Sequence, residues 1–91
     1  MSINSNIFFR KSDSLEVEEI DTGYFLSSDG RRWVKVERTA LAVWNSLEEP
    51  ASIGDLVTEL LGKYDGEPER IRSDVSALLM TWTELGLVAT Q

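Results

Sequence analysis

The stretch from Gly23 to Val36 constrains the fold of this 91-residue chain most strongly. Within it, two short runs rich in aromatic and β-branched residues flank the dipeptide Asp29-Gly30. An Asp-Gly pair supplies the positive φ angles that a tight hairpin turn needs. The stretch therefore predicts two antiparallel strands joined by a tight turn.

A further strand precedes this hairpin. Residues Leu15–Ile20 alternate partly between apolar and charged side chains, which is typical of a half-buried strand. The turn residues Asp21-Thr22-Gly23 connect this strand to the hairpin. We therefore expect a three-stranded antiparallel meander.

The last strand of the meander has two distinct faces. Alternation places Val34 and Val36 on one face with Arg32, and it places Trp33 and Lys35 on the other. Four cations and one acid between positions 31 and 38 give a local net charge of +3 in a chain whose total is −7. One interpretation is an exposed sheet edge that accepts an extended peptide as an added strand. The other is an ordinary edge strand that Arg and Lys keep soluble.

The remainder of the chain predicts three helices. The first has Thr39 as its N-cap and stops at Glu48-Glu49-Pro50. The second begins with Ser52 as its N-cap and Asp55 three residues on, close to a capping box, and ends at Tyr64. Their apolar faces are drawn from Ala40, Leu41, Val43, Trp44 and Leu47 in the first helix and from Ile53, Leu56, Val57, Leu60 and Leu61 in the second.

The third helix has the clearest pattern. Pro68 suits its first turn, and Gly86 is a fitting C-terminal cap before Leu87-Val88, which we expect to pack back on the body. Its apolar residues recur at spacings of four, three, four and three, which is typical of an amphipathic helix. These residues are Ile71, Val75, Leu78, Trp82 and Leu85.

Three other residues of this helix lie off that stripe. At about 100° per residue, Leu79 lies about 80° and Met80 about 180° from Ile71. Leu79 is therefore expected on the shoulder of the stripe, where it would line a peptide groove beside the sheet edge, and Met80 is expected to face out. Asp74 lies about 60° off the stripe, within reach of a partner's backbone.

These elements predict a single α+β domain over residues 1–91. It is winged-helix-like, with a three-stranded antiparallel sheet followed by a three-helix bundle that covers the apolar face of the sheet. Residues 1–6 are polar and are expected to form a flexible tail. Residues Ile7–Lys11 fit either a first strand or an arm that packs on the body.

The composition excludes several classes of chemistry. The chain has no Cys and no His, which removes disulfides, Cys/His zinc sites, thiol nucleophiles and imidazole bases. No carboxylate is paired at a predictable separation with a second acid, a base or a nucleophile. We therefore predict no catalytic residue, no cofactor and no metal site, and the chain is not expected to be an enzyme.

Charge and hydropathy limit the partners. A pI near 4.4 argues against nucleic acid, because neutralising phosphates calls for a basic face. No apolar run approaches the ~18–20 residues of a membrane span, and the first residues lack the layout of a signal peptide. We therefore expect a cytoplasmic protein with neither a nucleic acid nor a membrane as its partner.

A set of short motifs occurs in order along the chain: Gly23-Tyr24-Phe25-Leu26, Arg32-Trp33-Val34-Lys35-Val36, Ala40-Leu41-Ala42-Val43-Trp44, Ser52-Ile53-Gly54-Asp55-Leu56, Leu60-Leu61-Gly62-Lys63-Tyr64, Asp74-Val75 with Leu78-Leu79, and Gly86-Leu87-Val88. This ordered set covers roughly Leu15–Val88 and resembles the PqqD-like family. These are the precursor-peptide recognition domains of pathways that make and modify ribosomal peptides.

The resemblance implies a way of binding. In the family, the leader peptide of the precursor adds as a strand to the third strand of the sheet and lies against the third helix. Arg31, Arg32 and Lys35 would then steer an acidic leader. The peptide-binding residues that the resemblance implies are Arg32, Trp33, Val34, Lys35, Val36, Asp74, Val75, Leu78, Leu79 and Trp82.

The resemblance also implies partners. The chain is similar to the stand-alone recognition proteins of lasso-peptide pathways, whose partners are a leader peptidase and a cyclase. It also resembles the pyrroloquinoline quinone case, in which the partner is a radical enzyme. Two alternatives stay open: a DNA-binding winged-helix regulator, and an adaptor that docks a folded enzyme through Met80 or the arm at Ile7–Phe9.

Overall fold

The computed structural model describes residues 7–91. The expectation of a flexible tail at residues 1–6 lies outside the described part of the chain. In chain order the elements are β1 (Phe9–Lys11), β2 (Glu16–Ile20), β3 (Gly23–Ser27), β4 (Val34–Glu37), α1 (Thr39–Asn45), the 3₁₀ turn η2 (Ser46–Glu48), α2 (Ile53–Leu61), α3 (Pro68–Glu84) and β5 (Val88–Thr90).

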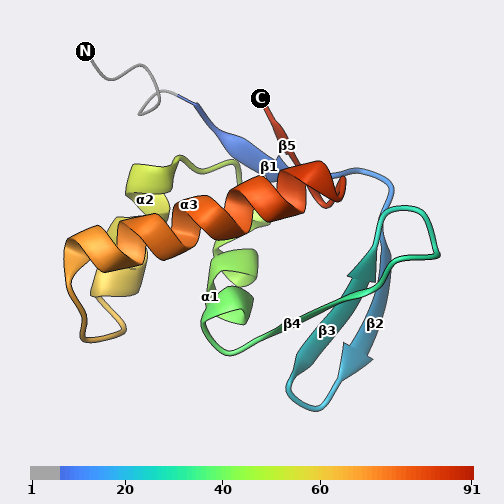
Figure 1. Ribbon diagram of the computed structural model, residues 1–91, viewed down its shortest axis with the longest axis horizontal. Helices are drawn as coiled ribbons and strands as arrows, with labels where there is room; N and C mark the ends of the chain where they lie inside the picture. Colours follow the sequence, from blue (N-terminus) through green and yellow to red (C-terminus); the bar gives the residue numbers. More distant parts are fainter. Residues whose placement is uncertain (1–6) are drawn as a thin grey trace.

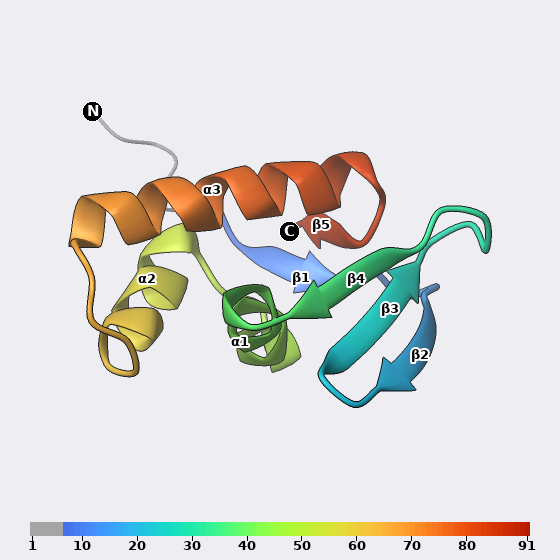
Figure 2. The same ribbon diagram turned by 60° about the horizontal axis from the view of Figure 1, so that its bottom comes forward.

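The predicted meander is confirmed. Strands β2, β3 and β4 form an antiparallel sheet in that order, so β2 and β4 are its two edges (Figure 1). The register pairs Ile20 with Gly23 across the two-residue loop Asp21-Thr22. It also pairs Leu26 with Val34, which fixes β4 against β3. Figure 2 shows β4 on the side of the sheet that faces α3.

The connection between β3 and β4 is longer than a tight hairpin turn. Gly30 has the positive φ expected of it, at 77°. However, β4 begins only at Val34. In the loop before it, the Asp29 carboxylate accepts the backbone N–H groups of Arg31 and Arg32 at 2.8 and 2.9 Å. This local turn competes with the strand ladder for the N–H of Arg32, which would face β3 if the alternation of β4 continued. The placement of Arg32 and Trp33 on the last strand is therefore wrong, since both lie in the loop.

A second, two-stranded sheet joins the ends of the described chain. Strand β1 pairs antiparallel with β5, and the Gln91 N–H donates to the Phe8 carbonyl at 2.8 Å. On its other side, Phe9 bridges to Ala51. The segment Ile7–Lys11 therefore contains a strand, and its partner β5 is an element that the sequence analysis did not predict.

Local signals set the helix ends, with one exception. Ser52 and Asp55 form the full capping box of α2, with bonds of 3.1 and 3.2 Å. At the end of α3, Gly86 has φ 75° and its N–H donates to Thr83, as in the Schellman motif. Thr39 is not an N-cap: α1 begins there, and the preceding Arg38 has φ 59° with no side-chain cap. Helix α2 ends at Leu61, before Tyr64.

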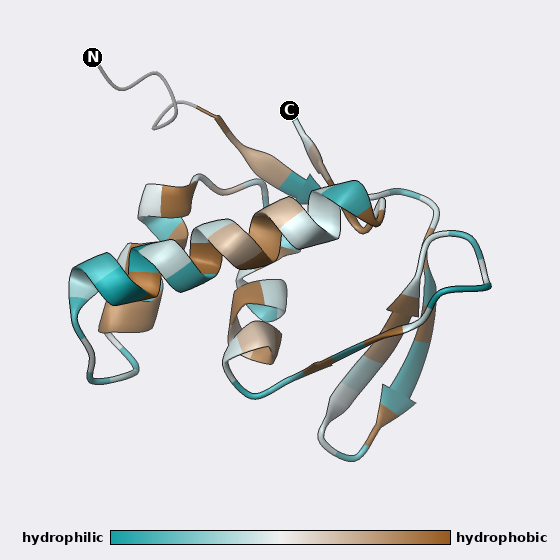
Figure 3. Ribbon diagram, viewed as in Figure 1, coloured by the Kyte–Doolittle hydropathy of each residue, from teal (hydrophilic) through white to brown (hydrophobic). Residues whose placement is uncertain are grey.

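The core lies where the helices meet the inner face of β3 and β4. Its centre is an edge-to-face pair of Trp44 and Trp82, with ring centroids 5.4 Å apart. Leu26 and Val36 contribute from the sheet and are fully buried. Figure 3 shows polar residues in the loop that joins β3 to β4 and at the start of α3. None of the helices within residues 7–91 is long and apolar enough to cross a membrane.

Candidate functional site

No strand within residues 7–91 lies beside the outer edge of β4. In an antiparallel ladder, opposite residues alternate between hydrogen-bonded and non-hydrogen-bonded pairs. The two-residue loop after Ile20 makes Ile20 and Gly23 a bonded pair, so the backbone groups of Gly23 face β2. By alternation, Val34 and Val36 direct their N–H and C=O groups at β3. The groups of Lys35 and Glu37 then point away from the sheet.

The position of one carbonyl agrees with this orientation. A Cβ atom built on Gly23 would overlap the carbonyl oxygen of Val36, so that carbonyl points toward β3. Successive carbonyls along a strand point to opposite sides. Those of Lys35 and Glu37 are therefore free acceptors at the edge.

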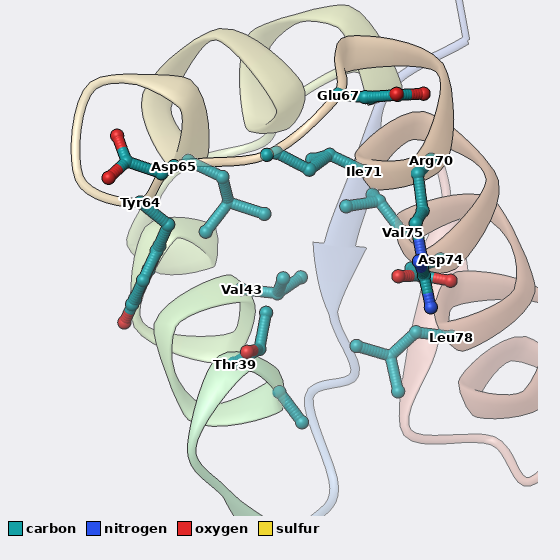
Figure 4. Close-up of a pocket in the computed structure, with 13 residues that line it drawn as sticks. Thr39, Val43, Tyr64, Asp65, Glu67, Arg70, Ile71, Asp74, Val75 and Leu78 are labelled. Atoms are coloured by element: carbon teal, nitrogen blue, oxygen red, sulfur yellow. The ribbon is translucent and has the colours of Figure 1, made fainter.

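A groove of about 780 Å³ opens where β4 runs into α1. Helix α1 forms one wall, α3 forms the other, and the loop after α2 closes one end (Figure 4). The groove has apolar surface within a charged rim. It is lined by Thr39, Ala40, Val43, Leu60, Tyr64, Asp65, Gly66, Glu67, Arg70, Ile71, Asp74, Val75 and Leu78.

A smaller hollow of about 340 Å³ lies at the other end of β4. Val34, at the start of the strand, shares it with Leu85 and Gly86 at the end of α3. Thr39, just past the strand, shares the large groove with Asp74 and therefore with the earlier part of α3. Strand β4 and helix α3 thus run in opposite directions, with a depression at each end of the strand. We call the region from the groove along the free edge to the hollow the cleft.

The face of α3 that packs into the core differs from the predicted stripe. Val75, Leu79 and Trp82 are 0–2% exposed, whereas Leu78 is half-buried and lines the groove. The prediction that Leu79 lines the groove wall is therefore wrong. Helix α3 packs against both α2 and β5, which widens its buried face toward Leu79. Met80 is 65% exposed and faces out, as predicted.

The predicted residues of the sheet also divide by exposure. Lys35 is exposed, and its Nζ lies 5.6 Å from the centroid of the Phe25 ring on the outer face. Val36 is fully buried and Val34 half-buried, so both face the core. Trp33 is 41% exposed in the loop, and Arg32 lines the hollow.

The loop that carries Arg31 and Arg32 is held by hydrogen bonds. The hydroxyl of Ser27, a fully buried residue, accepts the N–H groups of Asp29 and Gly30 at 3.3 and 2.8 Å. The backbone N–H groups of Arg32 and Arg31 hold the pKa of Asp29 below its ordinary value. Asp29 is therefore ionised at neutral pH, and the loop is fixed in one arrangement.

Several groove residues were not identified as site residues from the sequence. Tyr64 was assigned to the end of a helix, and Val43 and Ile71 were assigned to the core. Tyr64 could have been identified from the sequence as a candidate site residue. It is an aromatic residue next to the Asp65-Gly66 turn, and the core does not bury it. It is 46% exposed at the edge of the groove.

Two further properties of the described residues concern their acidic groups and their pKa values. Within residues 7–91, no three acidic side chains come close enough together to hold a metal ion. Shifted pKa values occur at Asp29 and Lys11. Hydrogen bonds from its own loop lower the pKa of Asp29, and the pKa of Lys11 is lowered because the effect of burial outweighs the opposite effect of Glu48. Lys11 lies over the ring of Trp44 at 4.7 Å, outside the cleft.

A three-stranded antiparallel sheet followed by three helices, with one sheet edge free beside the last helix, is the winged-helix-like fold of PqqD proteins. The sequence model of that family, described as coenzyme PQQ synthesis protein D, matches residues 24–88. The chain belongs to the PqqD family. No protein with curated annotation matches the sequence.

Two solved structures are similar to this one. Lasso peptide synthetase B1, solved as a complex with the leader peptide, is 25% identical and has a TM-score of 0.72 over 89% of this chain and 96% of the other. TbiB1, solved in complex with the TbiA(beta) leader peptide, is 18% identical and has a TM-score of 0.76 over 87% of this chain and 93% of the other. The second likeness concerns the fold.

Proposed function

We propose that this protein binds the leader region of a ribosomally made precursor peptide. The leader adds as a strand to the free edge of β4 and docks its apolar side chains against α3. The observation that carries the proposal is the unpaired edge of β4 with a depression at each end. The likeness to lasso peptide synthetase B1, solved with its leader peptide, supports it.

In this proposal, the residues of the cleft have different roles. The backbone N–H and C=O groups of Lys35 and Glu37 pair with the leader, which supplies affinity with little dependence on sequence. The groove between Ala40 and Leu78 receives an apolar leader side chain, and Asp74 lies at its rim. Val34 lines the hollow and Val75 lines the groove. The remaining residues named from the resemblance, Val36, Leu79 and Trp82, act through the scaffold, because they are buried in the core and line neither depression.

The domain is proposed to be non-catalytic and to present the leader to processing enzymes in the cytoplasm. The similarity to lasso peptide synthetase B1 favours a leader peptidase and a cyclase as those enzymes, ahead of a radical enzyme. The balance of charge disfavours the DNA-binding alternative. Helices α2 and α3 carry five acids and two cations, the reverse of what phosphate binding calls for.

A proline substitution tests strand addition directly. Leader peptides are synthesised from the precursor genes that neighbour the gene for this chain, labelled, and titrated by fluorescence anisotropy. Lys35→Pro removes the outward N–H and places a ring on the free edge, so we expect leader binding to be lost. Proline is tolerated at an edge position whose N–H faces solvent, so the fold persists.

Two controls isolate the backbone contribution. Lys35→Ala removes the same charge but keeps the N–H, and it is expected to weaken binding by less than tenfold. Glu19→Pro places proline at the matching outward position on β2, the opposite edge, and is expected to leave binding unchanged. If a leader binds equally well to Lys35→Pro, strand addition to β4 is wrong. If no neighbouring leader binds the unmodified protein, the adaptor alternative takes its place.

A further inference from the structure

The two ends of the cleft carry opposite charge. At the hollow and along the start of β4 lie Arg31, Arg32 and Lys35, which we call the basic end. Three acids on the rim of the groove, Asp65, Glu67 and Asp74, form what we call the acidic rim. These charges lie along a binding surface, so they bear on what binds there.

The cations of the basic end have no acidic partner. Within residues 7–91 the ion pairs are Arg10 with Asp13 and Lys63 with Glu59, both elsewhere in the molecule. The basic end holds three of the nine cations of a chain with a net charge of −7. Three unpaired cations beside a free strand edge, in a protein that is acidic overall, favour the binding of a negatively charged ligand at that edge.

Hydrogen bonds hold the backbone of the loop that carries Arg31 and Arg32. Asp29 and Glu84 also border the hollow, but the carboxylate of Asp29 is bonded to the N–H groups of Arg31 and Arg32. Ser27 holds the base of the same loop through two more backbone N–H groups. The backbone that carries the two arginine side chains is therefore held by hydrogen bonds before a partner docks.

The acidic rim is the counterpart at the groove. Asp65, Glu67 and Asp74 are exposed, and among the described residues Arg70 is the one cation that lines the groove with them. None of these four side chains forms an ion pair with another described residue. An apolar side chain in the groove would therefore be flanked by uncompensated negative charge.

The chain between the two ends sets their separation in residues. Strand β4 ends at Glu37, two positions after Lys35, and the backbone turns at Arg38, whose φ is 59°, before Thr39 begins α1 and lines the groove. An added strand can therefore follow β4 only as far as Glu37. A leader residue beside Lys35 is at least two residues from the one that fills the groove, and one that reaches Arg32, in the loop before the strand, is farther away.

We propose that the leader segment bound here is dipolar. It carries Asp or Glu two or more residues from the apolar residue that fills the groove, and Lys or Arg next to that apolar residue. This inference rests on the proposed function, since it specifies the charge pattern of the same ligand. The backbone pairing holds the leader at the edge, and the charges fix its register and its direction along β4.

Charge exchange between protein and peptide tests the pattern. The probe is the leader that binds best in the anisotropy titration, measured in low salt and again in about 1 M salt, where exposed charges are screened. Exposed ion pairs are weak, so the double variant Arg32→Glu with Lys35→Glu should bind about tenfold less tightly in low salt. A peptide whose acids are replaced by Lys should recover most of that loss on this variant and bind poorly to the unmodified protein.

A separate variant tests the acidic rim. Each end of the cleft also has a control variant. Asp74→Lys should weaken binding about threefold to fivefold, and a peptide whose cation is replaced by Glu should recover it. Glu69→Lys makes the same charge change as Asp74→Lys, and Arg72→Glu makes a cation-to-acid reversal like each of the two in the double variant. Both lie at exposed positions of α3 outside the groove and should leave the affinity unchanged.

The outcomes separate the inference from the function that it depends on. Binding that all these variants leave within twofold, or a bound leader without this charge pattern, overturns the dipolar ligand and leaves leader binding intact. Recovery by the exchanged peptides establishes it. Failure of every leader to bind the unmodified protein removes the proposed function and the inference together.

Discussion

The Cα atom of Gly23 lies against the backbone carbonyl oxygen of Val36, so closely that any Cβ at position 23 would overlap that oxygen. The carbonyl of Val36 therefore points toward β3, and by alternation those of Lys35 and Glu37 point to the outer edge. Position 23 admits no side chain unless the backbone shifts.

Gly23→Ala should therefore destabilise the protein. We expect a loss of about 2–3 kcal/mol in the free energy of unfolding, because backbone must move to admit the methyl group. Urea unfolding followed by tryptophan fluorescence measures it. The matched control is Gly54→Ala in α2, where a Cβ meets only the Ser52 hydroxyl at 3.8 Å. This change should be neutral or stabilising by up to about 1 kcal/mol. Equal effects of the two substitutions would contradict the close contact.

Neighbouring leucines on α3 should behave differently. Leu79 is fully buried, so Leu79→Ala should cost about 2–5 kcal/mol of stability through the cavity that it leaves. Leu78 lines the groove, so Leu78→Ala should leave most of the stability and weaken leader binding. Denaturant unfolding and anisotropy titration on both variants separate the two effects. A stable Leu79→Ala protein would show that the packing of α3 is different.

The loop after β3 should respond to acid. Bonds from the N–H groups of Arg32 and Arg31 lower the pKa of Asp29 in the folded protein below its ordinary value of 3.8. Stability from this ionised carboxylate is therefore present above the unfolded pKa and is lost as the pH falls through the lower, folded one. The amide proton resonances of Arg31 and Arg32 should titrate below pH 3.8, and Asp29→Asn should abolish that titration. A midpoint above 3.8 would contradict the bonding.

The capping box of α2 should contribute measurable stability. Ser52→Ala removes the hydroxyl that accepts the Asp55 N–H, and we expect a loss of about 1 kcal/mol. Thermal unfolding by circular dichroism measures it. Ser73→Ala, at an exposed position of α3, serves as the control and should change the midpoint little. An equal shift for both would mean that the cap is not formed in solution.

Signals that act over a few residues were read correctly from the sequence. The two-residue turn after Ile20, the cap at Ser52 and the C-terminal glycine Gly86 each depend on atoms close in the chain, so their outcome was fixed locally. The exceptions were also local. The side chain of Asp29 accepts the N–H of Arg32, which a longer β4 would have directed at β3, and the alternation of apolar residues does not reveal this competition.

The apolar pattern of α3 did not predict which of its residues are buried. Ile71 and Leu78 belong to the same helical stripe as Val75, yet only Val75 is buried, and Leu79 beside them is buried too. The reason is that α3 has neighbours on two sides, α2 and β5, and the width of a buried face depends on where those neighbours lie. Hydrophobic periodicity indicates which side of a helix faces the core, but it does not show how wide the buried face is.

By itself, the sequence determined the order of the three meander strands and the three helices, the start of α2, both ends of α3 and the basic character of the segment around Lys35, because turns, caps and charges are properties of neighbouring residues. Tertiary structure alone decided that β1 pairs with β5, that Tyr64 and Asp74 meet across one groove, and that the edge of β4 stays free. Each of these joins segments that are distant in the chain. Their contacts depend on how whole elements pack, and no stretch of sequence specifies that packing alone.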